Sequence, residues 1–129
     1  MAEQVNHPKH YNNDPSGIEC IEIIRNMSFD IGCAVKYLWR MGFKDGNPVV
    51  QDMNKALFYL EDELAYRGKG HDRKMVERPY VSLNKVIETR EYPLTEIYNL
   101  LFEYSFCVSD TEFLVDAIKL LKELIEKEK

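Results

Sequence analysis

The 129-residue sequence lacks the short motifs that mark the commonest nucleotide and hydrolase sites. It has no GxxxxGKS/T phosphate loop, no GxGxxG dinucleotide fingerprint, and no Ser or Cys nucleophile in a recognised strand–turn–helix elbow. Any phosphoryl transfer would therefore use a site of another kind. Cysteine is also scarce, because Cys20, Cys33 and Cys107 form no CxxC pair and no zinc-spaced cluster with histidine. We expect buried, reduced thiols, which fit a cytoplasmic protein.

Long apolar runs and an excess of positive charge are missing as well. No stretch approaches the length needed to cross a bilayer, and Met1–Lys9 is polar, without the apolar core of a secretory signal. We therefore expect no membrane partner and a location in the cytoplasm. The formal net charge of -5 argues against broad or sequence-specific binding of nucleic acid. It leaves room for a local basic pocket.

What the sequence does contain is an ordinary globular composition, 45% hydrophobic and 30% charged, with helical periodicity. Apolar residues recur every three or four positions, which predicts an all-α fold, a small bundle of about five short helices. The first helix is rich in isoleucine, so a strand remains an alternative there. An ordered, polar, non-helical arm is expected at residues 1–16. The expected helices span residues 18–27, 29–41, 49–66, 93–106 and 109–129.

Two pairs of residues have the spacing of capping boxes at helix starts: Ser16 with Glu19, and Ser109 with Glu112. Between the third and fourth expected helices the pattern is ambiguous. Val81–Leu83 is compatible with a short strand or an extended connection.

The chain is expected to form a single domain, residues 1–129, because each half alone is short for an independent core. Residues 68–79 are the predicted hinge between the halves. Residues 7–66 hold the candidate site, and residues 75–129 form a helical half. The last helix carries a broad apolar stripe, which favours assembly into a homo-oligomer.

Basic and aromatic side chains are densest in the first half. Lys36 and Arg40 lie one helical turn apart, on the side predicted to face away from the apolar stripe. Arginine offers a planar fork to phosphate oxygens, lysine offers a mobile charge, and a nearby ring can stack on a base. The candidate nucleotide-contacting residues are His7, Lys9, His10, Tyr11, Lys36, Tyr37, Trp39, Arg40 and Lys44.

The alternative is a solvated basic face with Asp52 or Glu61 as counter-charges, and charge spacing alone favours it. The His-Pro-Lys-His-Tyr string at residues 7–11 shifts the balance toward a binding site, because a bare tail needs no such side chains.

Metal sites are the weaker interpretation. His7 and His10 have no third ligand at a recognisable spacing. Magnesium remains open as a cofactor, because helical pyrophosphohydrolases chelate it with carboxylates on facing helices. Capping and ordinary exposed acidic faces explain the same residues. The acidic residues concerned are Glu19, Glu22, Asp52, Glu61, Asp62 and Glu63.

A series of short matches in residues 7–66 resembles a bacteriophage family described as SaV-like or as a domain of unknown function. The series starts at His10-Tyr11 and Gly17-Ile18-Glu19 and continues through Gly32–Arg40 and Lys44-Asp45-Gly46. It ends with Asp52–Ala56 and Tyr59-Leu60-Glu61. One departure is Cys33, where the family pattern usually has Asn.

The resemblance implies nucleotide chemistry. One phage relative is a nucleotide kinase that phosphorylates deoxynucleoside monophosphates without a P-loop and forms oligomers, and another is known through a bacterial abortive-infection system. On the matching positions, His10, Tyr11, Lys36, Tyr37, Arg40 and Lys44 are implied as nucleotide contacts. In a kinase, His10 would move a proton and Arg40 would neutralise phosphate charge.

Three functions are therefore expected to compete. The first is a nucleoside monophosphate kinase-like phosphotransferase. The second is a non-catalytic sponge that sequesters a nucleotide immune signal. The third is an interaction module that engages a host factor through residues 109–129.

Overall fold

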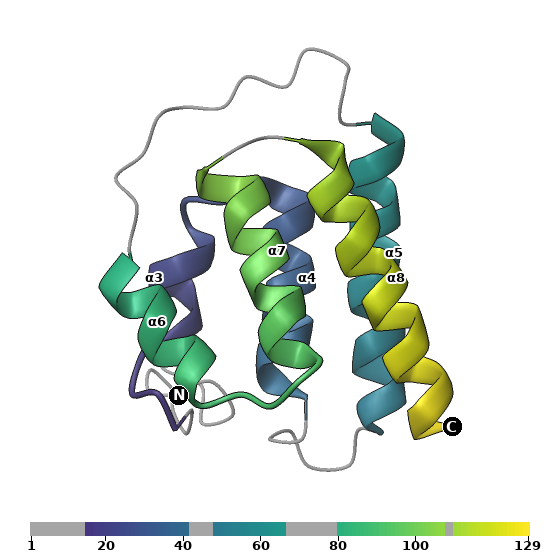
Figure 1. The fold of residues 1–129 in the computed structure, drawn as a ribbon, viewed down its shortest axis with the longest axis horizontal. Coiled ribbons are helices and arrows are strands. Elements are labelled where there is room, and N and C mark those ends of the chain that lie inside the picture. Colours follow the sequence, from purple (N-terminus) through teal and green to yellow (C-terminus); the bar gives the residue numbers. More distant parts are fainter. Residues whose placement is uncertain (1–14, 42–47, 67–79, 108–109) are drawn as a thin grey trace, which may run out of the picture.

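The computed structural model describes residues 15–41, 48–66, 80–107 and 110–129. These ranges contain six helices and no strand, so the expected all-α bundle is confirmed (Figure 1). The helices are α3 (Cys20–Ile24), α4 (Phe29–Arg40), α5 (Val49–Tyr66), α6 (Tyr80–Glu88), α7 (Leu94–Phe106) and α8 (Thr111–Glu128). Residues 1–14 of the predicted arm and the predicted hinge at 68–79 lie outside the described residues.

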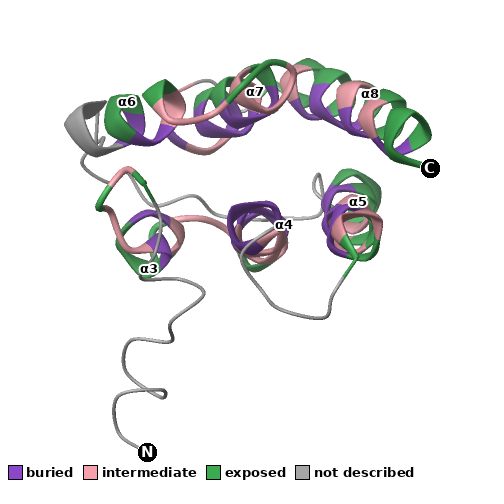
Figure 2. Cartoon of the chain, turned by 90° about the horizontal axis from the view of Figure 1, so that it is seen from below, coloured by how far each residue is buried: buried purple, intermediate pink, exposed green. Residues whose placement is uncertain are grey.

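The six helices form two layers. Figure 2 shows α3, α4 and α5 side by side in one layer, with α6, α7 and α8 in the other. Helix α7 lies over α4 and α8 lies over α5, and both pairs are in contact. Each layer therefore contains a hairpin of two long helices, flanked by one short helix, and the core lies between the layers.

The core follows the helical period predicted for each long helix. The fully buried residues of α4 recur at three- and four-residue spacing, and those of α5, α7 and α8 do the same. On α8 the stripe that favours self-association is instead buried within this chain, against α5 and α7. The buried members of that stripe are Leu114, Ala117, Ile118, Leu121 and Ile125. Oligomerisation stays a prediction and would need another surface.

Helix starts differ from the predicted capping boxes by one to three residues. Helix α3 starts after Glu19, whose box partner is Glu22, while the Ser16 hydroxyl accepts from the amide of Ile18 (3.1 Å). Helix α8 is capped by Asp110, whose carboxylate accepts from the amide of Glu112 (2.9 Å). The N-caps are thus Glu19 and Asp110, not the predicted Ser16 and Ser109, and both helices begin later than the sequence pattern predicted.

The prediction of a strand or extended connection at Val81–Leu83 is wrong, because residues 80–88 form α6. Leu83, Val86 and Ile87 have helical spacing, and the first two are buried. The β-branched valines lower helix propensity only slightly, and burial of a helical face outweighs that preference.

A buried carboxyl group joins the two layers. Glu63 of α5 is 5% exposed. One of its oxygens accepts from the Ser28 hydroxyl and the other from the Tyr104 hydroxyl of α7, each at 2.8 Å. The Ser28 oxygen in turn caps α4 by accepting from the amide of Ile31 at 3.2 Å. One side chain therefore links α5 to the start of α4 and to the opposite layer.

Tyr104→Phe should lower the free energy of unfolding by about 1–3 kcal/mol, because it removes a buried hydrogen bond to a carboxyl oxygen. Urea unfolding followed by circular dichroism measures the change. Tyr92→Phe is the matched control, since Tyr92 is 73% exposed, and it should stay within about 0.5 kcal/mol of the wild type. Equal stability of the two variants would contradict the assigned role of Tyr104.

Candidate functional site

Basic side chains from two helices converge on one tyrosine ring. Tyr37, in α4, is half-buried. The Arg40 guanidinium lies 4.7 Å from the ring centroid, and the ammonium groups of Lys36 and Lys55 lie at 5.6 and 5.4 Å. These distances are within the range of cation–π attraction. The structure thus brings Lys36, Tyr37 and Arg40 together as the sequence predicted, and adds Lys55 from α5.

Arg40 does not project into solvent as its position in the sequence suggested. The residue is 7% exposed and its partner Asp52 is 1% exposed. Their single contact joins Nη2 to Oδ1 at 3.4 Å. Arg40 is in the last turn of α4 and Asp52 in the first turn of α5, so the hairpin itself brings them together and each charge suits its helix end. Asp52 was weighed as a counter-charge to a solvated face, but the pair is buried.

An aromatic strip continues from this cluster along the hairpin. Tyr59 of α5 lies parallel to Tyr37, with centroids 6.0 Å apart and an interplanar angle of 12°. Phe29 and Phe58 meet Tyr59 edge to face at 6.1 and 5.2 Å, and remain 76% and 63% exposed. Sequence reasoning missed these rings and Lys55. The available signal was the spacing of Lys55 and Tyr59, one turn apart and off the buried stripe of the predicted helix.

The other end of the strip is acidic. Burial raises the pKa of Asp30 to about 7, aided by a hydrogen bond with Asp62 and by the negative charges of Asp62 and Glu63. Between the two ends lies Cys33. Burial raises the pKa of the Cys33 thiol, while nearby Lys36 opposes that rise. The charge of Cys33, followed by partial burial, raises the pKa of Tyr59. The hairpin surface therefore runs from a cationic end, past four rings, to a carboxyl end.

Trp39 is not part of this surface, contrary to the prediction. It is 1% exposed and meets Tyr98 of α7 edge to face, with Arg90 5.0 Å from the indole. The reason is helical geometry, because Trp39 follows Val35 by one turn and shares its buried stripe. Trp39 packs against Tyr98 of the other layer, whereas Tyr37 stacks on Tyr59 of the neighbouring helix α5.

The carboxylates considered for magnesium have other partners. Asp52 pairs with Arg40, and Glu63 accepts from Ser28 and Tyr104. Glu61 forms an ion pair with Lys122 of α8 at 3.7 Å. Across the described residues, no three His, Cys, Asp or Glu side chains are grouped so as to hold a metal ion.

Five of the predicted contacts, His7, Lys9, His10, Tyr11 and Lys44, lie outside the described residues. Their part in the site stays a prediction.

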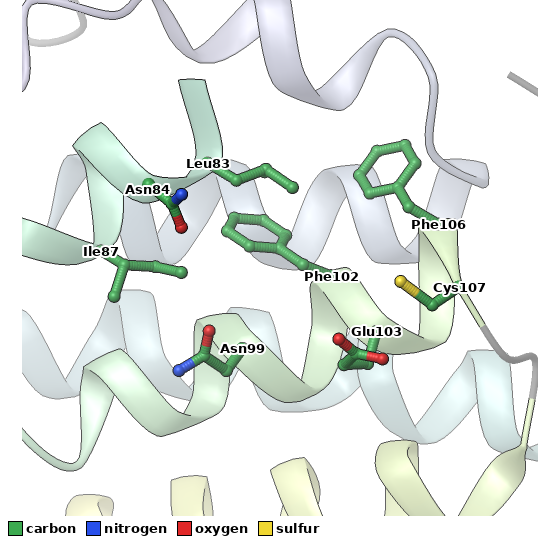
Figure 3. Close-up of a pocket in the computed structure, with 8 residues that line it drawn as sticks. All are labelled: Leu83, Asn84, Ile87, Asn99, Phe102, Glu103, Phe106 and Cys107. Atoms are coloured by element: carbon green, nitrogen blue, oxygen red, sulfur yellow. The ribbon is translucent and has the colours of Figure 1, made fainter. Parts of the chain in front are cut away.

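Two hollows elsewhere suit phosphate less well. The first, about 210 Å³, lies between α6 and α7, where Leu83 and Phe102 point toward each other (Figure 3). Its charged lining residue is Glu103, and its described lining holds no lysine or arginine. The second, about 500 Å³, lies between α5 and α8. Its lining includes Lys119 and Lys122, but Lys122 is paired with Glu61 at 3.7 Å, and no aromatic ring is in its described lining. The α4–α5 surface alone combines several cations with rings among the described residues.

Fold and surface together define a class: a two-layer, all-α protein that carries a cationic, aromatic face on one helical hairpin. Residues 5–61 match the sequence model of a family described as a protein of unknown function, DUF3310. The match spans α3, α4 and most of α5, including the cationic end, and stops before α6–α8. It supports the resemblance seen in residues 7–66 at the level of a family without an assigned function. No curated protein and no solved structure matches the chain. Among the described helices, none has the length and apolar character needed to span a bilayer.

The raised pKa of Asp30 predicts a pH-dependent stability. The ordinary value is 3.8, so between about pH 4 and about pH 7 the unfolded chain releases a proton that the folded chain keeps. The contribution of Asp30 to stability is therefore present below about pH 4 and is lost as the pH rises through about 7. Asp30→Asn should remove this dependence of the free energy of unfolding on pH. The stability of the variant relative to the wild type should therefore increase as the pH rises.

Urea unfolding of both proteins at several values from about pH 4 to about pH 8 tests this prediction. Asp116→Asn, at an exposed position of α8, is the matched control and should follow the wild type at every pH. A difference between Asp30→Asn and wild type that is constant with pH would contradict the assignment.

Proposed function

We propose that the outer face of α4 and α5 binds a phosphorylated nucleotide. The observation that supports this most directly is the convergence of Lys36, Arg40 and Lys55 on the Tyr37 ring. The phosphate would lie at the cationic end, where charge-assisted hydrogen bonds from arginine and lysine are strong. The base would stack on the aromatic strip, in which Phe29 and Phe58 offer exposed rings.

The competing interpretation is a solvated basic face whose charges are neutralised within the protein. Arg40 has a counter-ion in Asp52, but neither Lys36 nor Lys55 forms an ion pair with a carboxylate of the described residues. Two ammonium groups beside a ring, without an acidic partner there, leave a local excess of positive charge on a chain whose net charge is -5. That local excess favours an anionic ligand over a purely structural role.

Binding supports two kinds of activity. In the first, the protein is a kinase-like phosphotransferase, with the cations neutralising phosphate charge and His10 in the predicted proton transfer. In the second, the same cations hold a nucleotide without turnover and so sequester it. We give the kinase-like activity first, on the resemblance in residues 7–66 alone. Recovery of the ligand after incubation separates them, because only the first alters it chemically.

Lys55→Met should weaken nucleotide binding by about 10-fold, because it removes one charge that faces the phosphate while keeping the length of the side chain. Native mass spectrometry with nucleoside mono-, di- and triphosphates and cyclic nucleotides measures binding, and re-examination of each ligand reveals turnover. Lys119→Met, on the exposed side of α8, is the matched control and should bind like the wild type. Absence of binding by the wild-type protein to every ligand would overturn the proposal and direct attention to a protein partner.

A further inference from the structure

The hollow between α6 and α7 combines apolar and polar side chains (Figure 3). It lies in the other layer from the α4–α5 surface and outside residues 5–61, the region that matches the family model. Its volume is about 210 Å³. Sites for drug-sized ligands measure about 300 to 1,000 Å³, so this hollow suits a smaller molecule. Its large apolar lining residues are Leu83, Ile87, Phe102 and Phe106.

Three polar side chains line the same hollow from two helices. Asn99 and Glu103 are one turn apart on α7, so they project from the same side of that helix, and Asn84 belongs to α6. Figure 3 shows Asn84 across from the two residues of α7. Within the described part of the chain, none of these three side chains forms a hydrogen bond or an ion pair. Their oxygen atoms are therefore available to a ligand.

Charge indicates which sign of ligand this hollow attracts. Glu103 is the charged residue of the described lining, α7 contains no lysine or arginine, and Lys85 of α6 is not a lining residue. A carboxylate without a cation beside it repels anions and attracts positive charge. The rings of Phe102 and Phe106 favour the same sign, because the face of an aromatic ring is negative. The hollow thus has the opposite preference to the cationic end of the α4–α5 surface.

Hydrogen-bond chemistry narrows the class of ligand further. A primary ammonium has three N–H donors and no acceptor. The lining supplies three groups that accept, which are the carboxylate of Glu103 and the side-chain carbonyls of Asn84 and Asn99. A quaternary ammonium has the charge but no N–H donor, and an alcohol has one donor but no charge. Neither of them can use the whole set.

We propose that the hollow between α6 and α7 binds a small primary amine with an apolar body. The ammonium donates to the carboxylate of Glu103 and to the side-chain carbonyls of Asn84 and Asn99. The apolar body lies against Leu83 and Phe102, which point toward each other (Figure 3). This site is separate from the proposed nucleotide site, so each can bind its ligand without the other.

An NMR titration of the full chain with phenethylamine tests the proposal, because the amide chemical shifts of the protein report both affinity and location. Phenethyl alcohol keeps the body and lacks the charge, and phenethyl trimethylammonium keeps the charge and lacks the N–H donors. The amine should bind at least about 10-fold more tightly than either, with shifts concentrated in residues 83–107. Equal affinity for the amine and either matched probe, or no saturable binding of the amine, would overturn the proposal.

Glu103→Gln keeps the shape of the side chain and removes its charge, so it should weaken amine binding by about 10-fold and leave the alcohol unaffected. Glu123→Gln, at an exposed position of α8, changes the net charge equally and should bind like the wild type. Asn99→Leu removes a second acceptor at similar size and should also weaken the amine. Equal losses in Glu103→Gln and Glu123→Gln would indicate unspecific attraction to an acidic protein and overturn the site. Wild-type affinity in folded Glu103→Gln would overturn it as well.

Discussion

The carboxyl group of Glu63 is the constraint on which the arrangement of the two layers depends. A carboxyl group that is 5% exposed is tolerated only when its oxygens accept hydrogen bonds, and here Ser28 and Tyr104 donate them from different layers. Apolar contacts alone would allow small rotations of α5 about its axis. Two directional bonds to one side chain fix that rotation. They also fix which residues of α5 face α4 on the outer side, since Tyr59 and Lys55 precede Glu63 by one and two turns.

Two buried polar contacts thus stand near opposite ends of the α4–α5 hairpin, and they differ in quality. Both oxygens of Glu63 are satisfied at 2.8 Å. Arg40 and Asp52 share a single contact of 3.4 Å, and within the described part of the chain Nε and Oδ2 have no hydrogen-bond partner. A fully bonded group stabilises the fold and has little left to offer a ligand. A poorly bonded charged pair costs stability and keeps donors available. The contrast distinguishes the structural end of the hairpin from the end that we propose as the binding site.

The sequence predicted what depends on local period and composition, and missed what depends on contacts between distant segments. The bounds of α4, α5 and α7 followed from apolar spacing and from residues such as Pro93. Helix α6 was missed because its short, β-branched sequence is helical only when one face is buried. In the site, Lys36 and Tyr37 were found from one segment, but Lys55 and Tyr59 required knowing which face of α5 meets α4. Burial of Arg40 could not be read from helix α4 alone, because the covering residue is Asp52.

The two layers have different roles, and these follow from the same contacts. The family match ends at Glu61, so it includes the cationic and aromatic residues of the hairpin but neither Glu63 nor Tyr104. The inner side of α4 and α5 carries buried apolar residues, among them Leu38, and this side faces the layer that contains α7 and α8. Without the second layer, this apolar face would be exposed to water, and the rotation of α4 and α5 about their own axes would not be fixed. The layer of α6–α8 therefore acts as the support that orients the surface carried by α4 and α5. Substitutions in the second layer should therefore change the position of Lys55 and Tyr59 by altering the rotation of α5. They would not act through direct contact with a ligand.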